Sequence, residues 1–351
     1  MGTAAGLESD VRVQQGASWV PRMRHTFQLE NGDVFADLKP GDVAAAAERI
    51  RPVVVRTPLR RSGGLSEVSG VDVWLKLETE QVTGSFKLRG AANTLSTLSR
   101  QHREIGVVAS SAGNHGLGVA FAARREGVPA TIYVPHNAPN VKKDGIAALG
   151  ASIIDSAPDY DAAMVLAKRH AAQLGAYFIN PCVGDPLIAG QGTVALEVFE
   201  ELPDLATMVV PVGGGGLLGG TGVYLRGAAP HVRIVGAQSE LTAAMSRSLA
   251  ADRLVEIPSV PTLADGLAGQ IDAEALDIGR YALDEMLTVT EHELARAIAW
   301  LHHEESVTAE GAGAVGVAAV LGGKIAGLTG PVAIVVSGGN IDDDRLGEIL
   351  G

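Results

Sequence analysis

The sequence predicts an α/β protein built on mostly parallel sheets. From Asp42 onward, short apolar runs alternate with segments of helical periodicity, the arrangement typical of βαβ units. Several runs are apolar at nearly every position, as expected for strands covered by helices on both faces. At 351 residues the chain exceeds what one hydrophobic core usually supports, and it has no Pro/Ser-rich linker. We therefore expect one large domain or two interleaved ones.

The expected elements follow in chain order. The alanine-rich segment 42–50 predicts a helix, and residues 86–100 predict a second. Residues 290–305 predict a third, because Thr290 and Glu293 form a capping box and the apolar residues share one stripe. The expected strands are 71–78, 106–110, 130–134, 151–155, 207–212, 232–237 and 331–337.

Composition restricts the class of function. The net charge of −12 leaves no basic face for a nucleic acid. No stretch approaches the roughly 20 apolar residues of a membrane helix. Residues 1–38 predict a polar extension that lacks the apolar core of a signal peptide. We therefore expect a cytoplasmic protein. Cys182 is the single cysteine, which excludes an intrachain disulfide, and we expect it to be buried.

Ligands of parallel sheets bind beyond the carboxyl ends of strands, and a glycine run lies at such a place. It comprises Gly213, Gly214, Gly215 and Gly216, followed by Leu217, between a predicted strand and a helix. Glycines leave the backbone N–H groups unobstructed, and the helix start adds positive potential. The run therefore predicts a phosphate site.

The same run also satisfies a dinucleotide-binding pattern. Gly214, Gly216 and Gly219 spell GxGxxG, so an NAD-dependent dehydrogenase stays an alternative. Four consecutive glycines meet that pattern easily, however, and Gln238 stands where the pattern expects an acid.

Three further turns carry reactive or polar groups. Lys87 follows a glycine turn and Phe86, in the first turn of a helix, where the dipole favours a neutral, nucleophilic amine. Alone, such a lysine is usually a solvated surface residue. Residues 110–116, SSAGNHG, open another helix and suit a carboxylate, although an N-cap would explain one serine. Residues 337–340, SGGN, close the last strand, where a hydroxyl is ordinarily a helix cap.

Together, the four turns resemble those of the fold-type II pyridoxal-phosphate enzymes, in particular the threonine/serine dehydratase (threonine ammonia-lyase) and serine racemase branch. The resemblance implies two interleaved open α/β domains with mostly parallel sheets, a tryptophan synthase beta-like fold. It implies a large cofactor-binding domain at 39–104 and 184–351 and a small mobile domain at 105–183. It also implies a homodimer or homotetramer.

The resemblance implies a role for each turn. Lys87 would hold the cofactor and act as the catalytic base. Contacts to pyridoxal 5′-phosphate are implied for Phe86, Lys87, Asn114, Gly213, Gly214, Gly215, Gly216, Leu217, Glu310 and Ser337. Contacts to the substrate are implied for Ser111, Ala112, Asn114 and His115.

The implied activity is β-elimination from a small β-hydroxy amino acid, L-threonine and also L-serine, to a 2-oxo acid and ammonia. A neutral Ser337 at the pyridine nitrogen makes a weaker electron sink, which favours prompt loss of a β-hydroxyl. Ala112 stands where racemases carry a serine. Gln238, Thr242 and Ala244 stand where they carry acidic metal ligands, so we expect no divalent ion. A serine racemase, or a dehydratase of 3-hydroxyaspartate or phenylserine, stays an alternative.

Overall fold

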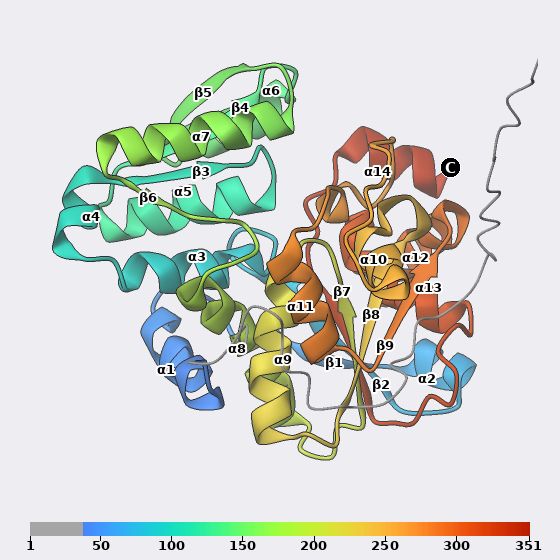
Figure 1. Cartoon of the computed structure of the whole chain (residues 1–351). Coiled ribbons are helices and arrows are strands. Elements are labelled where there is room, and N and C mark those ends of the chain that lie inside the picture. Colours follow the sequence, from blue (N-terminus) through green and yellow to red (C-terminus); the bar gives the residue numbers. More distant parts are fainter. Residues whose placement is uncertain (1–37) are drawn as a thin grey trace, which may run out of the picture.

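The structure is a computed structural model that describes residues 38–351. The polar extension predicted at residues 1–38 lies outside the described residues, apart from residue 38. Figure 1 shows two β-sheets on opposite sides of the molecule, with helices packed between them. Among the helices of residues 38–351, none combines the length and the apolar character that a bilayer crossing requires.

The larger sheet has six strands, all parallel except for the first. In spatial order they are β1 (Leu59–Ser62), β2 (Val73–Leu77), β10 (Val332–Val336), β7 (Thr207–Pro211), β8 (Arg233–Ser239) and β9 (Glu285–Val289). The central strands β7 and β10 are buried at every position, as their apolar runs predict. The last strand in sequence, β10, lies between β2 and β7. Distant parts of the chain therefore meet at the centre of this sheet.

The smaller sheet has four parallel strands from one continuous segment. In spatial order they are β5 (Ser152–Ala157), β4 (Ala130–Pro135), β3 (Val107–Ser110) and β6 (Tyr177–Phe178). Successive side chains along each strand point to opposite faces of the sheet. Val108 and Tyr133 pack against helix α7 (Tyr160–Leu174), whereas Ala109 and Ile132 face α5 (Asn114–Glu126) and α6 (Asn140–Ala147).

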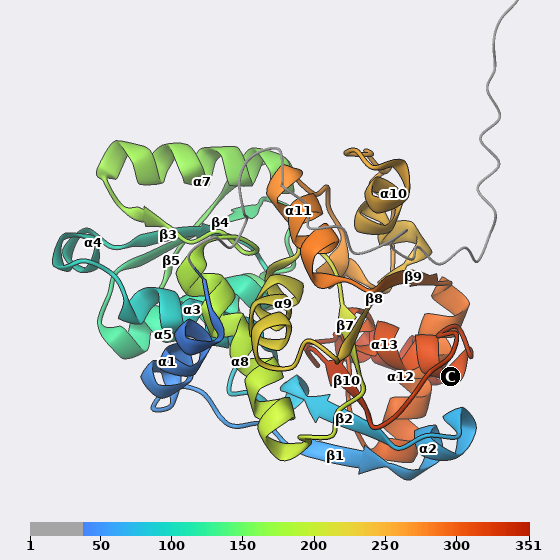
Figure 2. The ribbon, with the colours of Figure 1, turned by 60° about the horizontal axis from the view of Figure 1, so that its bottom comes forward.

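The remaining helices cover the larger sheet and fill the space between the two sheets. They are α1 (Pro40–Ile50), α2 (Gly63–Ser69), α3 (Lys87–Ser96), α4 (Arg100–Ile105), α8 (Asp185–Glu201), α9 (Gly216–Ala228), α10 (Ala244–Ala251), α11 (Ala273–Ala282), α12 (Glu291–Glu305), α13 (Gly311–Leu321) and α14 (Asp343–Leu350), with 3-10 turns η1 (Glu78–Glu80), η2 (Glu240–Thr242) and η3 (Asp265–Leu267). Helices α8 and α9 lie on one face of the larger sheet and α12 and α13 on the other (Figure 2).

The predicted elements are confirmed within two residues at each end, with one exception. The helix predicted at 86–100 was wrong in extent, because α3 ends at Ser96 and α4 begins at Arg100. The break has a local cause: the Ser99 hydroxyl accepts a hydrogen bond from the N–H of His102 and caps the new helix. Strands β1, β6 and β9 were not predicted. The domain boundaries at 105 and 183 stay predictions.

Candidate active site

The turn that carries the lysine and the turn that ends the last strand lie side by side. We call residues 83–87 the lysine turn and residues 337–340 the serine turn. The two turns pair as an isolated antiparallel bridge. In addition, the N–H of Phe86 donates to the carbonyl oxygen of Ser337 at 3.1 Å. Ser337 itself is buried. Backbone hydrogen bonds therefore fix the position of the serine hydroxyl relative to the start of α3.

Lys87 is the first residue of α3 and is half-buried. Its Nζ donates to the carbonyl oxygen of Pro181 at 2.9 Å and lies 5.2 Å from the centroid of the Phe86 ring. Gly118 of α5 packs directly against the backbone of this first turn, where a Cβ would come within 3.1 Å. The amine is therefore held inside the junction between the sheets and is not a solvated surface group.

The asparagine loop, residues 110–116, reaches across to the larger sheet. Nδ2 of Asn114 donates to Oε1 of Glu310 at 2.7 Å. Oδ1 of Asn114 accepts from Nδ2 of Asn340 at 2.6 Å. Asn114, Glu310 and Asn340, which lie far apart in the sequence, thus meet at one amide.

Ser111 and His115 differ in burial within the asparagine loop: Ser111 is half-buried and His115 is buried. The Ser111 hydroxyl accepts a hydrogen bond from the N–H of Gly113 at 3.1 Å. The His115 side chain is buried, with Nε2 3.1 Å from the carbonyl oxygen of Ile179. Burial and the positive charge of Lys87 lower the pKa of His115 from 6.5 to about 3, so the ring is neutral. A carboxylate bound here would meet the backbone N–H of His115.

The glycine loop, residues 213–217, joins β7 to α9. Gly215 adopts a φ of +92° just before α9 begins. The first N–H groups of α9 have no partner within the helix and point out of its start. A Cβ at Gly214 would come within 2.4 Å of the sulfur of Cys182. Cys182, expected to be buried, is half-buried and forms a wall of this loop.

Glu310 immediately precedes α13 and is buried. Burial raises the pKa of its carboxyl to about 8, and the negative charge of Asp265 adds to this effect. The hydrogen bond from Asn114 and the charges of Lys142 and Lys87 oppose the rise. At neutral pH the carboxyl is therefore mostly protonated.

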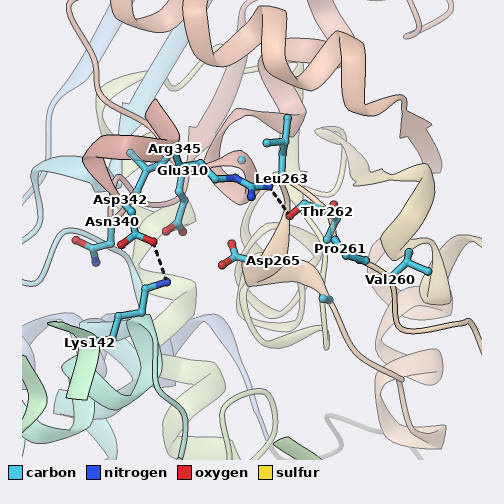
Figure 3. Close-up of a pocket in the computed structure, with 13 residues that line it drawn as sticks. Lys142, Val260, Pro261, Thr262, Leu263, Asp265, Glu310, Asn340, Asp342 and Arg345 are labelled. Atoms are coloured by element: carbon cyan, nitrogen blue, oxygen red, sulfur yellow. Dashed lines mark hydrogen bonds and ion pairs between the residues drawn. The ribbon is translucent and has the colours of Figure 1, made fainter. Parts of the chain in front are cut away.

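A pocket of about 260 Å³ opens beside Glu310 and Asn340 (Figure 3). Lys142 of α6 approaches Asp342 to 3.9 Å at its edge. Figure 3 shows Asp265 pointing into the pocket from the opposite side. Lys142 belongs to the segment of the smaller sheet and the other residues named here to that of the larger sheet. The pocket therefore lies where the two halves of the fold meet.

The four turns fit pyridoxal phosphate in their donors and acceptors. Thr83 Oγ1, Ser85 Oγ, Ser110 Oγ and His115 Nδ1 are buried and find no hydrogen-bond partner among the described residues. Buried polar groups are normally satisfied, and four of the eight buried atoms without a partner among the described residues lie in the lysine turn and the asparagine loop, which indicates a polar ligand at these two turns. An amine for an aldehyde, a side-chain-free N–H cradle for a phosphate and a buried hydroxyl for a ring nitrogen are all present.

Gln238 lies at the end of β8 and is fully buried. Its Nε2 donates to the carbonyl oxygen of Thr242 at 2.9 Å, and its Oε1 accepts from the N–H of Ser246 at 3.1 Å. Within residues 38–351 no group of three or more His, Cys, Asp or Glu side chains is placed to hold a metal ion. The expected absence of a divalent ion stays a prediction.

Comparison with known proteins identifies the class. Residues 50–338 match the family described as pyridoxal-phosphate dependent enzymes, and the chain belongs to that family. It is 45% identical to the L-threonine ammonia-lyase of Thermotoga maritima over 310 residues, 88% of this chain and 77% of that protein. This confirms the predicted cofactor, and the dehydrogenase alternative built on Gly214, Gly216 and Gly219 is set aside.

Solved structures give the same answer for the fold. Maize serine racemase is similar with a TM-score of 0.85 and 33% identity, over 89% of this chain and 96% of that one. Threonine deaminase isoform 2 from Solanum lycopersicum is similar with a TM-score of 0.82 and 32% identity, over 88% and 90%. The predicted fold class, two interleaved α/β halves with mostly parallel sheets, is confirmed.

Proposed function

We propose that this chain is an ammonia-lyase that eliminates water from a small β-hydroxy amino acid, L-threonine and also L-serine. The observation that carries the proposal is the position of Lys87. Its amine stands at the start of α3, 2.9 Å from the carbonyl oxygen of Pro181, with the serine turn on one side. The residue after Pro181, Cys182, forms a wall of the glycine loop. The 45% identity to an L-threonine ammonia-lyase supports the substrate class.

Pyridoxal phosphate, when bound, supplies an electron sink for a bond broken at the substrate α-carbon. Nζ of Lys87 then takes the α-proton as a general base. The N–H groups of the glycine loop would bind the phosphate of the cofactor. Ser111 and the N–H groups at the start of α5 bind the substrate carboxylate. The neutral hydroxyl of Ser337 would lie at the ring nitrogen and would not hold a proton there, which favours prompt loss of the β-hydroxyl.

Over the whole reaction one water molecule is lost and one is taken up. The substrate loses its α-proton and its β-hydroxyl as one water molecule. The unsaturated amine that leaves the protein takes up water again and hydrolyses to a 2-oxo acid and ammonia. Lys87 passes the proton that it removed to the departing β-hydroxyl, so that water leaves and the amine is neutral again for the next turnover.

The second candidate is racemisation, which the likeness to maize serine racemase favours. A racemase needs an acid or base on each face of the α-carbon. Ala112 has no side chain able to move a proton, whereas Lys87 serves one face only. We therefore place elimination first, and racemisation is the alternative that experiment must distinguish from it.

The first experiment tests the cofactor and the lysine. Purified protein with added pyridoxal phosphate is expected to show a visible absorbance band that borohydride removes, and K87A is expected to lack it. K143A is the matched control, because Lys143 pairs with Asp155 of β5 at 3.0 Å and does not line the pocket beside Glu310. Absence of the band in the wild type, or its persistence in K87A, would contradict the proposal.

The second experiment tests the reaction. A panel of L-threonine, L-serine, 3-hydroxyaspartate and phenylserine is followed by 2-oxo acid formation, with chiral analysis of the remaining amino acid. Turnover is expected for threonine and serine without D-product. Appreciable D-serine would favour racemisation, and dependence on a divalent ion would count against the interpretation of Gln238. Light scattering during chromatography tests the proposed homodimer or homotetramer.

A further inference from the structure

Asn340 bonds to two of the turns from one nitrogen atom. Its Nδ2 donates to the carbonyl oxygen of Thr83 at 2.8 Å and to Oδ1 of Asn114 at 2.6 Å. Its Oδ1 lies against Gly84, where a Cβ would come within 2.4 Å. Gly84 has a φ of +71°, so this close approach and the turn itself both favour glycine. The side chain of Asn340 is thus held between the lysine turn and the asparagine loop.

The backbone decides the direction of these hydrogen bonds. A carbonyl oxygen accepts and never donates, so Thr83 requires the NH₂ end of the Asn340 amide to face it. That same NH₂ end faces Asn114, which must therefore present its oxygen to Asn340. The Nδ2 of Asn114 then points the other way, toward Glu310.

Glu310 on its own does not impose this orientation. Its carboxyl is mostly protonated at neutral pH, since burial raises the pKa to about 8. A protonated carboxyl both donates and accepts, so it can pair with either end of the Asn114 amide. Asn340 is therefore the partner that distinguishes the two orientations of Asn114.

We propose that Asn340 is a positioning residue that orients the Asn114 amide, so that the Nδ2 hydrogen not bonded to Glu310 is presented to the cofactor. The inference rests on the proposed cofactor site. The ring oxygen beside the aldehyde of pyridoxal phosphate is an acceptor when ionised and needs a donor next to it. With the amide reversed, Asn114 would place a second oxygen there, and the two would repel.

The test is N340D, which keeps the shape and reverses the polarity. A carboxylate accepts only, so it cannot donate to Thr83 and draws the Nδ2 of Asn114 toward itself. We expect the affinity for pyridoxal phosphate to fall about tenfold or more, the size of one lost charge-assisted hydrogen bond. The pH at which the visible band changes form should shift, and kcat should fall more than KM rises.

The variant N340A separates the orientation of the Asn114 amide from the volume of the side chain at position 340. Alanine removes the donor without adding a competing acceptor, so we expect its defect to lie between the wild type and N340D. A merely space-filling role predicts the opposite order, because aspartate preserves the volume of asparagine. The matched control is N137D, which introduces the same charge at an exposed position in the loop before α6 and should leave affinity and spectrum unchanged.

The experiment distinguishes failure of the Asn340 proposal from failure of the proposed function. If wild-type protein forms no band with pyridoxal phosphate, the cofactor site itself is wrong. If the wild type forms the band and N340D matches it in affinity, spectrum and kcat, the role of Asn340 is overturned. A defect in N340A larger than that in N340D also overturns it. Thermal unfolding of each variant without cofactor measures folding separately; Asn340 is exposed, so the unfolding temperatures should agree.

Discussion

The sulfur of Cys182 lies directly against the α-carbon of Gly214. A Cβ at that glycine would come within 2.4 Å of Sγ and 3.1 Å of the Cys182 Cβ. The preceding residue, Pro181, accepts the hydrogen bond of Lys87. One short segment therefore forms a wall of the glycine loop and holds the amine of Lys87.

This contact predicts the effect of G214A. The added methyl group would displace the thiol or the loop, and overpacking of this kind typically costs about 1–3 kcal/mol. We expect affinity for pyridoxal phosphate to fall about tenfold, measured by titration of the visible band. C182A should partly restore the affinity of G214A, because the remaining Cβ contact is 3.1 Å. G63A, at a position with open space, is the control. Full affinity in G214A would refute the prediction.

Arg89 of α3 belongs to a buried ionic cluster, and we expect its substitution to lower the stability of the protein strongly. Arg89 pairs with Glu78 at 2.8 Å and with Glu197 at 2.7 Å, and Lys76 pairs with Glu197 at 2.6 Å. Arg89, Lys76 and Glu78 are fully buried. R89M leaves two carboxylates facing one cation, so the free energy of unfolding should fall by about 3–5 kcal/mol in urea titrations.

The control for R89M is R61M. Arg61 and Asp72 form an ion pair with both side chains about half exposed. Water screens such a pair, and its loss should cost less than about 1 kcal/mol. Equal effects of the two substitutions would mean that the buried cluster does not depend on its charge balance.

The neutral His115 predicts acid sensitivity. Its pKa is about 3 in the folded protein against 6.5 ordinarily, so between these values the unfolded chain binds one more proton. Stability from this source is complete above pH 6.5 and declines as the pH falls, by up to about 1.4 kcal/mol per pH unit. H115Q should show a shallower decline between pH 6.5 and 4 in urea titrations. H303Q, at an exposed position, should follow the wild type.

The protonated Glu310 predicts that glutamine replaces it well at neutral pH. E310Q keeps an oxygen for the N–H of Asn114 and should bind pyridoxal phosphate within about threefold of the wild type at pH 7. In the wild type, affinity should change as the pH rises through about 8 and the carboxyl ionises. E310Q should lack this change. D265N should move its midpoint to lower pH, because Asp265 helps to raise the pKa of Glu310.

The fold was predictable where strands are buried on both faces. The runs at 207–212 and 331–337 became β7 and β10 because only apolar residues suit that environment. Strand β1 was not predicted because it is an edge strand of sequence LRRS. Its two arginines reach solvent, so it has no apolar run. Strand β6 has two residues and no pattern of its own.

The candidate site could be predicted where its chemistry belongs to single turns. The glycine run, the lysine and the asparagine loop each carry a local pattern. The contact of Asn340 with Thr83 spans 257 positions, and Cys182 meets Gly214 from another part of the chain. The sequence marks Asn340 only as the last residue of the turn 337–340 and Cys182 only as the single cysteine, so only the folded arrangement reveals what each one touches.

The central place of β10 sets the order in which the protein can be made. The smaller sheet uses residues 107–178 and can assemble while synthesis continues. The larger sheet cannot join β2 to β7 until residues 332–336 have left the ribosome. Ser337 and Asn340 follow immediately. Until then the nascent chain carries one assembled sheet and one open sheet, and it becomes able to take up its cofactor only after residue 340 has been made.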